Sequence, residues 1–258
     1  MDLIIPTYGR ASWSQQHTLR QLIADKLMPT LVVQQREVPD YHWYDGDVHV
    51  LPSNIQAISE TRDYILHDMR GDKKILVMDD DLHFAVRRQD DPTKFRKLEE
   101  GDLRRMVFEA DVALSQRPHM GIGAREGGNR NTDRYMWNSR LMRVHGFRRD
   151  ILQKHLITFA PMVVMEDFHV TLQVLRAGYD VMILNEWVSN QAGGSNAPGG
   201  CSSYRTEAVQ TAAAHKLAAL HPGLVRVVQK ATKTAWGGGT RTDVVISWKK
   251  ARDYDQDR

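Results

Sequence analysis

The chain of 258 residues is predicted to fold as one α/β domain in which helices flank a mainly parallel sheet. Short apolar runs bounded by turn residues indicate buried strands, and they alternate with longer segments whose apolar residues recur at helical spacing. Hydrophobic residues form 41% of the chain, which is enough for a sizeable core, and no internal repeat is evident. We therefore place the domain at residues 1–248 and expect a polar tail at residues 249–258.

The first half of the chain shows this alternation most clearly. Its expected strands are residues 3–6, 31–34, 48–51 and 75–78, and its expected helices are residues 12–27 and 55–69. Pro29 closes the first helix and Gly71 the second. Residues 7–10 follow the first strand, and the triplet Asp79-Asp80-Asp81 follows the fourth. Because ligands of parallel sheets collect at the carboxyl ends of the strands, both segments are expected to face one crevice.

The second half is less regular. Its expected helices are residues 102–116, 168–177 and 204–220, and its expected strands are residues 121–124, 140–144, 181–184 and 244–246. Residues 146–155 are expected to hold a turn or short helix, and residues 87–97, dense in charges of both signs, to be solvated. Residues 185–205 are rich in glycine, and loops of this length and composition are often lids. A second glycine loop spans residues 236–241.

The composition excludes several classes of protein. The single cysteine, Cys201, rules out a disulfide framework and a thiolate zinc site. The first residues are typical of a strand and not of a secretory leader, and no apolar run approaches the roughly 18 residues of a membrane helix. A cytoplasmic protein is therefore expected. With 35 Lys and Arg against 32 Asp and Glu, the net charge of +3 permits a basic face for nucleic acid without requiring one.

Three consecutive carboxylates, Asp79 to Asp81, follow a buried strand and repel one another unless a cation lies among them. Because strand side chains alternate, Asp79 and Asp81 are expected on the same side, where one can bind a divalent metal while its neighbour orients a sugar or nucleotide hydroxyl. The alternative interpretation is a solvated acidic turn.

A second acidic pair, Glu166-Asp167, begins a predicted helix much later in the chain. The two acidic elements together suit transfer from an activated sugar. A metal bound by carboxylates neutralises the charge of the departing pyrophosphate, and a further carboxylate removes the proton of an acceptor hydroxyl.

Three motifs carry a resemblance to known glycosyltransferases. Ile4 to Arg10, Asp79 to Asp81 and Met165 to Asp167 are similar, in this order, to the motifs of GT-A nucleotide-sugar glycosyltransferases of the inverting GT2 type. A narrower resemblance is to the TET-associated glycosyltransferases of bacteriophages. The segments that carry it are the opening motif with Thr18-Leu19, the aspartate triplet, Glu166 to His169 with Gln173, Arg176 to Tyr179, and Tyr204 to Thr206.

The resemblance implies a Rossmann-like GT-A fold, a UDP-sugar donor and a role for each motif residue. Asp81, with Asp79, would bind Mn²⁺ or Mg²⁺, and Asp79 or Asp80 would contact the ribose. Asp167 would remove the acceptor proton while Glu166 orients the donor sugar. The residues expected against the uridine are Pro6, Thr7, Tyr8 and Arg10. Arg205, or Lys233 and Arg241, lie beside the glycine loops and are candidates to bind the diphosphate.

The implied acceptor is a hydroxymethylated pyrimidine, of the 5-hydroxymethylcytosine type, in double-stranded phage DNA, where the sugar would protect against host restriction. The arginines between Arg125 and Arg149 suit such a polyanion. The candidate acceptor contacts are Arg125, Arg130, Arg134, Tyr135, Trp137 and His169. Two alternatives stay open: a saccharide or lipid-linked glycan acceptor, and a metal-dependent nuclease or nucleic-acid binder.

Overall fold

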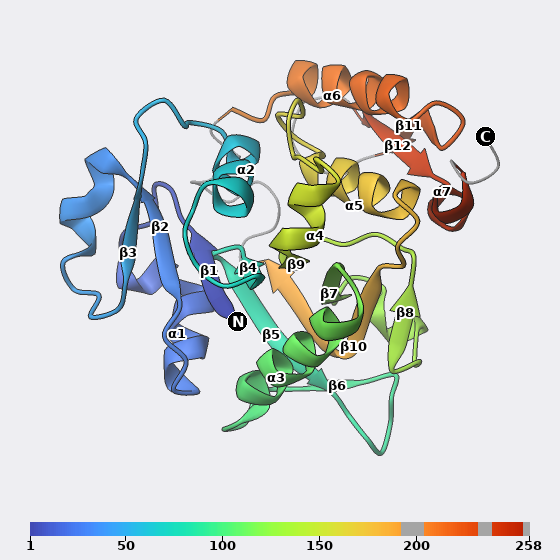
Figure 1. Cartoon of the computed structure of the whole chain (residues 1–258). Coiled ribbons are helices and arrows are strands. Elements are labelled where there is room, and N and C mark those ends of the chain that lie inside the picture. The colour runs from blue at the N-terminus through green and yellow to red at the C-terminus, as the bar shows by residue number, and fades with distance from the viewer. Residues whose placement is uncertain (192–203, 232–238, 255–258) are drawn as a thin grey trace.

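The computed structural model describes residues 1–191, 204–231 and 239–254, and it confirms the α/β prediction (Figure 1). In this part of the chain, ten strands form one sheet in the order β3-β2-β1-β4-β9-β7-β10-β5-β6, with β8 paired to β10. A separate sheet pairs β11 with β12.

One half of the large sheet is parallel. It consists of β3 (Val48–Leu51), β2 (Thr30–Gln34), β1 (Asp2–Pro6) and β4 (Lys74–Met78). Side chains alternate between two cores, so Ile4 packs on one face of the sheet and Ile5 on the other. Since these strands run in the same direction, the segments after β1 and β4 meet at one edge and line one pocket.

The other half of the sheet is mixed. Its strands are β9 (Val144–Arg148), β7 (His119–Ala124), β10 (Met182–Gln191), β5 (Leu82–Arg87), β6 (Phe95–Arg96) and β8 (Tyr135–Trp137). β9 lies antiparallel between β4 and β7, β7 runs parallel to β10, and β10 is antiparallel to β5 and β8.

One strand prediction in this half was wrong, and the strands β5, β6 and β8 were not predicted. We expected a strand at residues 140–144, but the strand is β9, which begins at Val144. His145, Gly146 and Arg148 interrupt its apolar pattern, and hydrogen bonding to a strand on each side stabilises it nevertheless. The strand β5, which was not predicted, follows the aspartate triplet and pairs with β10.

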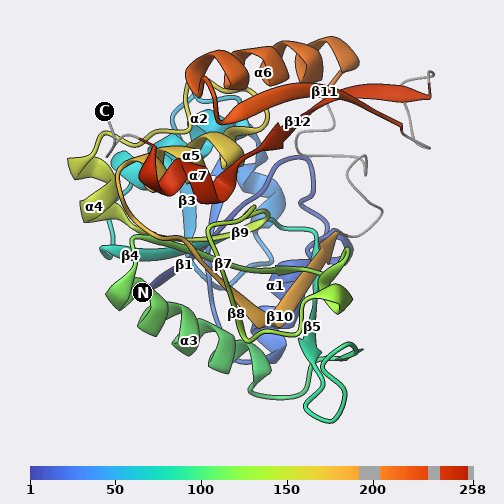
Figure 2. The same ribbon diagram turned by 90° about the vertical axis from the view of Figure 1, so that its right-hand side faces the viewer.

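Helices cover both faces of the sheet (Figure 2). On the face of Ile4 lie α2 (Ile58–His67), α4 (Arg149–Lys154) and α5 (Glu166–Arg176), and on the other face lie α1 (His17–Ala24) and α3 (Asp102–Gln116). Short 3₁₀ helices occupy Trp13–Gln15, Gln35–Tyr41 and Gly128–Arg130. At the start of α2, the Glu60 carboxylate accepts the N–H groups of Gln56 and Ala57 at 2.7 and 2.9 Å, which satisfies main-chain donors of the first turn.

The C-terminal part forms a further layer over α5 (Figures 1 and 2). It contains α6 (Glu207–Leu220), the hairpin of β11 (Val225–Ala231) and β12 (Thr240–Ile246), and α7 (Trp248–Asp253). The expected polar tail is therefore helical up to Asp253, because Ala251 is buried in the core and the Trp248 ring packs on Phe168. The strand β11 was not predicted.

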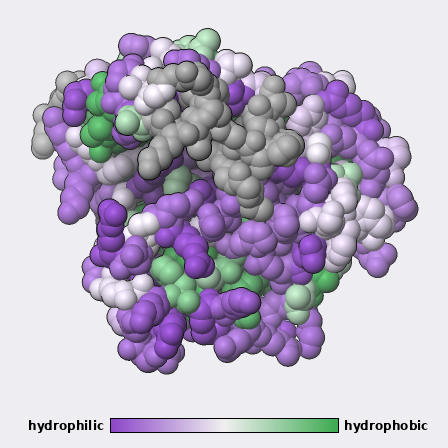
Figure 3. Space-filling model, turned by 180° about the vertical axis from the view of Figure 1, so that it is seen from behind, coloured by the Kyte–Doolittle hydropathy of each residue, from purple (hydrophilic) through white to green (hydrophobic). Residues whose placement is uncertain are grey.

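The surface seen from behind is mainly hydrophilic, with hydrophobic residues in small areas (Figure 3). No helix in the described ranges is both long and apolar enough to cross a membrane.

Candidate active site

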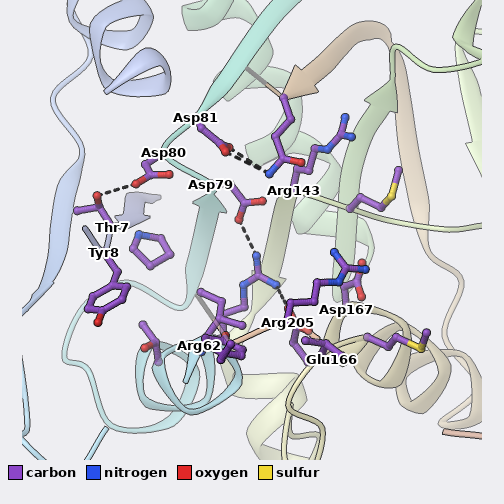
Figure 4. A pocket seen from close by; sticks show the side chains of 18 of the residues that line it. Thr7, Tyr8, Arg62, Asp79, Asp80, Asp81, Arg143, Glu166, Asp167 and Arg205 are labelled. Atoms are coloured by element: carbon purple, nitrogen blue, oxygen red, sulfur yellow. Dashed lines mark hydrogen bonds and ion pairs between the residues drawn. The ribbon is translucent and has the colours of Figure 1, made fainter. Parts of the chain in front are cut away.

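A pocket of about 400 Å³ lies at the carboxyl ends of β1 and β4. The loop after β1 contributes Thr7, Tyr8 and Arg10, the turn after β4 contributes Asp79 to Asp81, and the start of α5 contributes Glu166-Asp167. Figure 4 shows these side chains around the same space. The fold thus brings together two acidic motifs that are far apart in the sequence.

Asp80 is held through both of its oxygens. Thr7 Oγ1 donates to Asp80 Oδ2 at 2.6 Å, and the Arg10 guanidinium pairs with Oδ1. The Thr7 hydroxyl accepts from Tyr41 at 3.1 Å and from Gln16 at 2.9 Å. Burial raises the pKa of Asp80, and the contacts with Arg10 and Thr7 oppose that rise. This buried network fixes the loop after β1 against the end of β4.

Asp81 carries a less completely neutralised charge. Arg10 lies 3.2 Å from Asp81 Oδ2, and Gln191 Nε2 lies 3.3 and 3.2 Å from Oδ1 and Oδ2. Burial, together with the charge of Asp79, raises the pKa of Asp81 to about 6. A cation close to this carboxylate would lower that pKa and stabilise the charge.

The aspartates fit a divalent metal only if the ligand supplies part of its coordination. Within residues 1–191, 204–231 and 239–254, no three His, Cys, Asp or Glu side chains converge as a ready metal site. Mg²⁺ and similar ions are often bound by one or two carboxylates plus substrate phosphates and water. Asp81, with its raised pKa, and Asp79 offer such a partial set of oxygen ligands.

Arg62 joins the two acidic motifs, and the sequence analysis did not identify it. Its guanidinium contacts Asp79 Oδ1 at 2.7 Å and Glu166 Oε1 at 2.5 Å, as the dashed lines in Figure 4 show. The residue is only 5% exposed. The sequence did indicate that Arg62 is buried, because it lies at helical spacing between Ile58 and Ile65, on the buried face of α2.

Glu166 and Asp167 begin α5 and are weaker acids than usual. Burial raises the pKa of Glu166 to about 7, against the opposing charge of Arg62, and burial also raises the pKa of Asp167, against the charges of Arg140 and Arg62. The main-chain N–H of Phe168 donates to Asp167 Oδ1 at 2.9 Å. A carboxylate with a pKa near neutrality is a good acceptor for a proton at physiological pH.

Two non-glycine residues beside these motifs have left-handed backbone conformations. Met165, directly before Glu166, has a φ of 62°, and Arg143 has a φ of 67°. The carbonyl of Arg143 accepts the N–H of Asp79 at 2.9 Å, and its side chain pairs with Glu126 at 2.7 Å. Such conformations cost energy and are retained where the surroundings enforce them, commonly at functional sites.

Other residues expected to bind the donor also line the pocket. They are Pro6, Arg205 and Arg241. Lys233 lies outside the described residues, as do residues 192–203 of the glycine-rich segment expected to form a lid. Tyr204, which follows that segment, accepts the main-chain N–H of Ile58 at 3.2 Å, so the chain returns to the pocket beside α2.

The candidate acceptor contacts do not line this pocket. Arg125, Arg130, Arg134, Tyr135 and Trp137 lie elsewhere. Arg134 pairs with Glu109 of α3 at 3.0 Å, and the Trp137 ring is covered by Arg117 at 5.4 Å. The arginine-rich segment is therefore divided among several parts of the surface, because it passes through β8 and β9 and its side chains point to different neighbours.

His169 has structural partners and lies outside the pocket lining. Its Nε2 donates to the carbonyl of Ala160 at 3.2 Å, which leaves Nδ1 to accept from His221 Nε2 at 2.8 Å. Burial lowers the pKa of His169 to about 4, so the ring is neutral at physiological pH. These contacts connect α5 with the C-terminal end of α6.

A family model described as TET-Associated Glycosyltransferase matches residues 1–200, and no curated protein matches the chain. Among solved structures, residues 1–349 of TarS from S. aureus in complex with UDP-GlcNAc have a TM-score of 0.50 and 14% identity, over 84% of this chain and 67% of that chain. GalNAc-T7 with UDP, GalNAc and Mn²⁺ has a TM-score of 0.48 and 10% identity, over 84% of this chain and 48% of that chain. The similarity to TarS shows the fold.

Proposed function

Because the chain belongs to the TET-associated glycosyltransferase family and is a glycosyltransferase of GT-A fold, we propose that it transfers a sugar from a UDP-sugar to a hydroxymethylated pyrimidine in phage DNA. The reaction would take place in the cytoplasm of the host cell and protect the DNA from restriction. The observation that carries the proposal is the pocket itself, in which Arg62 joins a strand-end aspartate to the acidic start of α5.

The end of the pocket near β1 would bind the nucleotide. Tyr8 is partly exposed there, and Arg36 stacks on its ring with the guanidinium carbon 5.2 Å from the centroid. A flat, braced ring of this kind suits stacking against a uracil base. Asp79 lines the pocket and has one oxygen bound by Arg62, so its other oxygen is placed to accept from a ribose hydroxyl.

Asp81, assisted by Asp79, would hold Mn²⁺ or Mg²⁺ together with the donor diphosphate. When bound, the ion would neutralise charge on the departing diphosphate. Arg205 lines the same pocket and is oriented by Gln210. The Nε and Nη2 atoms of Arg205 donate to Gln210 Oε1 at 3.3 and 3.1 Å. A guanidinium fixed in this way suits a phosphate group.

Asp167 would act as the general base. Arg62 donates a hydrogen bond to the Glu166 carboxylate at 2.5 Å, whereas the Asp167 carboxylate accepts one from the main-chain N–H of Phe168. Asp167 is thus better able to accept the proton of the acceptor hydroxyl as that oxygen attacks the sugar. Glu166, held by Arg62, would orient the donor sugar.

The proposal is tested by incubating the protein with labelled UDP-sugars and Mn²⁺ in the presence of different acceptors. A duplex containing 5-hydroxymethylcytosine should become labelled, and an unmodified duplex of the same sequence should not. Label on a free saccharide instead would identify a glycan acceptor, and cleavage of either duplex would identify a nuclease.

A further inference from the structure

One end of the pocket is built by residues beyond the region that the family model matches. The matched region ends at residue 200, yet Arg205, Gln210, Arg241 and Asp243 all line the pocket. They come from the segment before α6, from α6 and from β12. These residues form one wall of the pocket, and Figure 4 shows one of them, Arg205, next to the start of α5, on the opposite side of Arg62 from Tyr8.

Arg140, from the segment before β9, lines the same end of the pocket as this wall. The guanidinium carbon lies 4.6 Å from the centroid of the Phe168 ring, and the Trp248 ring packs edge-on against the same ring at 5.8 Å. Among the described residues, Arg140 makes no hydrogen bond or ion pair with another side chain or with the main chain. Stacking thus orients a guanidinium whose N–H groups remain available to a ligand.

Arg241 lies in the same wall and adds positive charge. It pairs with Asp243 at 3.0 Å, and Lys230 pairs with the same carboxylate at 3.2 Å, so the charge of Asp243 is already neutralised. The Nε atom of Arg241 is buried and has no hydrogen-bond partner within the described part of the chain. A buried donor without a partner is costly, and an anion in this wall would supply one.

Arg140 and Arg241 lie on the side of the pocket where the acceptor would bind. Of the positive charges near the proposed base, Arg140 has the largest effect on the Asp167 carboxylate. Because the base must contact the acceptor hydroxyl, a guanidinium beside it faces the acceptor. The donor diphosphate is expected between Asp79, Asp81 and Arg205, and Arg241, a candidate for the diphosphate from its sequence, is assigned here to the acceptor instead.

We infer that Arg140 and Arg241 form an anion subsite that binds a backbone phosphate of the nucleic-acid acceptor, beside the target base. In a pyrimidine nucleotide in the usual anti orientation, the C5 substituent lies on the same side of the ring as the nucleotide's own 5′ phosphate. Arg140 and Arg241 can therefore bind that phosphate while the hydroxymethyl group lies next to Asp167. Guanidinium groups match phosphate oxygens with two parallel hydrogen bonds. The inference rests on the proposed transfer to DNA and specifies how that acceptor is positioned.

The experiment removes the charge of one phosphate at a time. Wild-type protein and Arg140→Gln are given oligonucleotides with one 5-hydroxymethylcytosine, in which either the phosphate 5′ to that base or a distant phosphate is replaced by a neutral methylphosphonate. For wild type, the 5′ replacement should lower kcat/KM about 10- to 100-fold, which is typical of losing hydrogen bonds to a charged group. For Arg140→Gln, the same replacement should change kcat/KM by less than about twofold, because the partner is already absent.

Two further variants make the result specific. Arg140→Lys keeps the charge but cannot form two parallel hydrogen bonds, so it should show an intermediate sensitivity to the 5′ replacement. Arg104→Gln removes an exposed arginine outside the pocket and should retain the wild-type sensitivity. Equal losses in wild type and Arg140→Gln would overturn the subsite while leaving transfer to DNA intact. An Arg140→Gln variant with a raised KM for the UDP-sugar and full sensitivity to the 5′ replacement would assign Arg140 to the donor. No transfer by wild type to any hydroxymethylated oligonucleotide would overturn the proposed function and the subsite with it.

Discussion

The two ends of the pocket differ in how completely their polar groups are satisfied. At the end near β1, Thr7 and Arg10 occupy both oxygens of Asp80, and Tyr41 and Gln16 in turn bind Thr7. At the end near α5 and β12, the guanidinium of Arg140 and the Nε of Arg241 have no hydrogen-bond partner among the described residues. At the first end the protein itself satisfies the Asp80 carboxylate, although Gln16 Oε1 is buried without a partner among the described residues, and the second end presents guanidinium groups that a ligand would complete.

Arg62 lies between these ends, and replacing it should have the largest effect. In Arg62→Met, Asp79 and Glu166 lose their shared partner, and breaking a buried ion pair typically costs about 3–5 kcal/mol. Urea unfolding monitored by circular dichroism measures the loss. The matched control is Arg104→Met, whose side chain is 42% exposed and pairs with the exposed Glu100 at 3.7 Å, so its loss should cost no more than about 1 kcal/mol. Similar losses in the two variants would show that Arg62 does not join the ends.

The acidic end is probed next by Asp167→Asn. We expect transfer to fall by roughly 10²-fold or more, because asparagine cannot accept a proton, while UDP-sugar binding stays close to that of wild type. Single-turnover kinetics and calorimetry measure the two quantities separately. A normal transfer rate would place the base elsewhere, with Glu166 the next candidate.

The donor end is probed by Asp81→Asn. This change keeps the shape of the side chain and removes the charge that a divalent ion would contact, so metal-dependent binding of UDP should weaken at least about tenfold. Calorimetry with UDP in Mn²⁺ and in EDTA separates the metal-dependent part. If the Mn²⁺-dependent affinity is unchanged in the variant, Asp81 is not the metal ligand.

The pH dependence should give the smallest effect. Glu166 has a pKa of about 7 and lies beside Asp167, whose pKa is also raised, so the pair retains a proton below neutral pH. Because a proton held by the pair makes the base less available, transfer should fall as the pH drops below the Glu166 pKa of about 7. A pH–rate profile that is flat from pH 5.5 to 8 would contradict this assignment.

The same proton affects stability with the opposite sign. Because the pKa of Glu166 is raised in the folded protein, its favourable contribution is complete below the ordinary value of 4.5 and is lost as the pH rises through about 7. In thermal melts, the melting temperature should therefore fall less between pH 5 and pH 8 for Glu166→Gln than for wild type.

The sequence by itself determined the elements of the parallel half of the sheet and the type of chemistry. The parallel half was predictable because each of its strands is a short apolar run followed by turn residues, and parallel strands leave those turns at one edge. This reasoning placed residues 7–10 and Asp79 to Asp81 in one crevice. The acidic motifs were recognisable because consecutive carboxylates repel one another and need a counter-charge.

Only the tertiary structure decided which charges meet. Arg62 is an ordinary helical arginine in the sequence, and it connects the two acidic motifs because α2 and α5 pack on the same face of the sheet. His169 was predicted as an acceptor contact, but in the structure its ring is hydrogen-bonded to His221, which directly follows α6. β9 has no clear apolar pattern and is a strand because β4 and β7 pair with it on both sides. The local pattern of a sequence reports burial, but the partners of buried charges depend on contacts between residues that are distant along the chain.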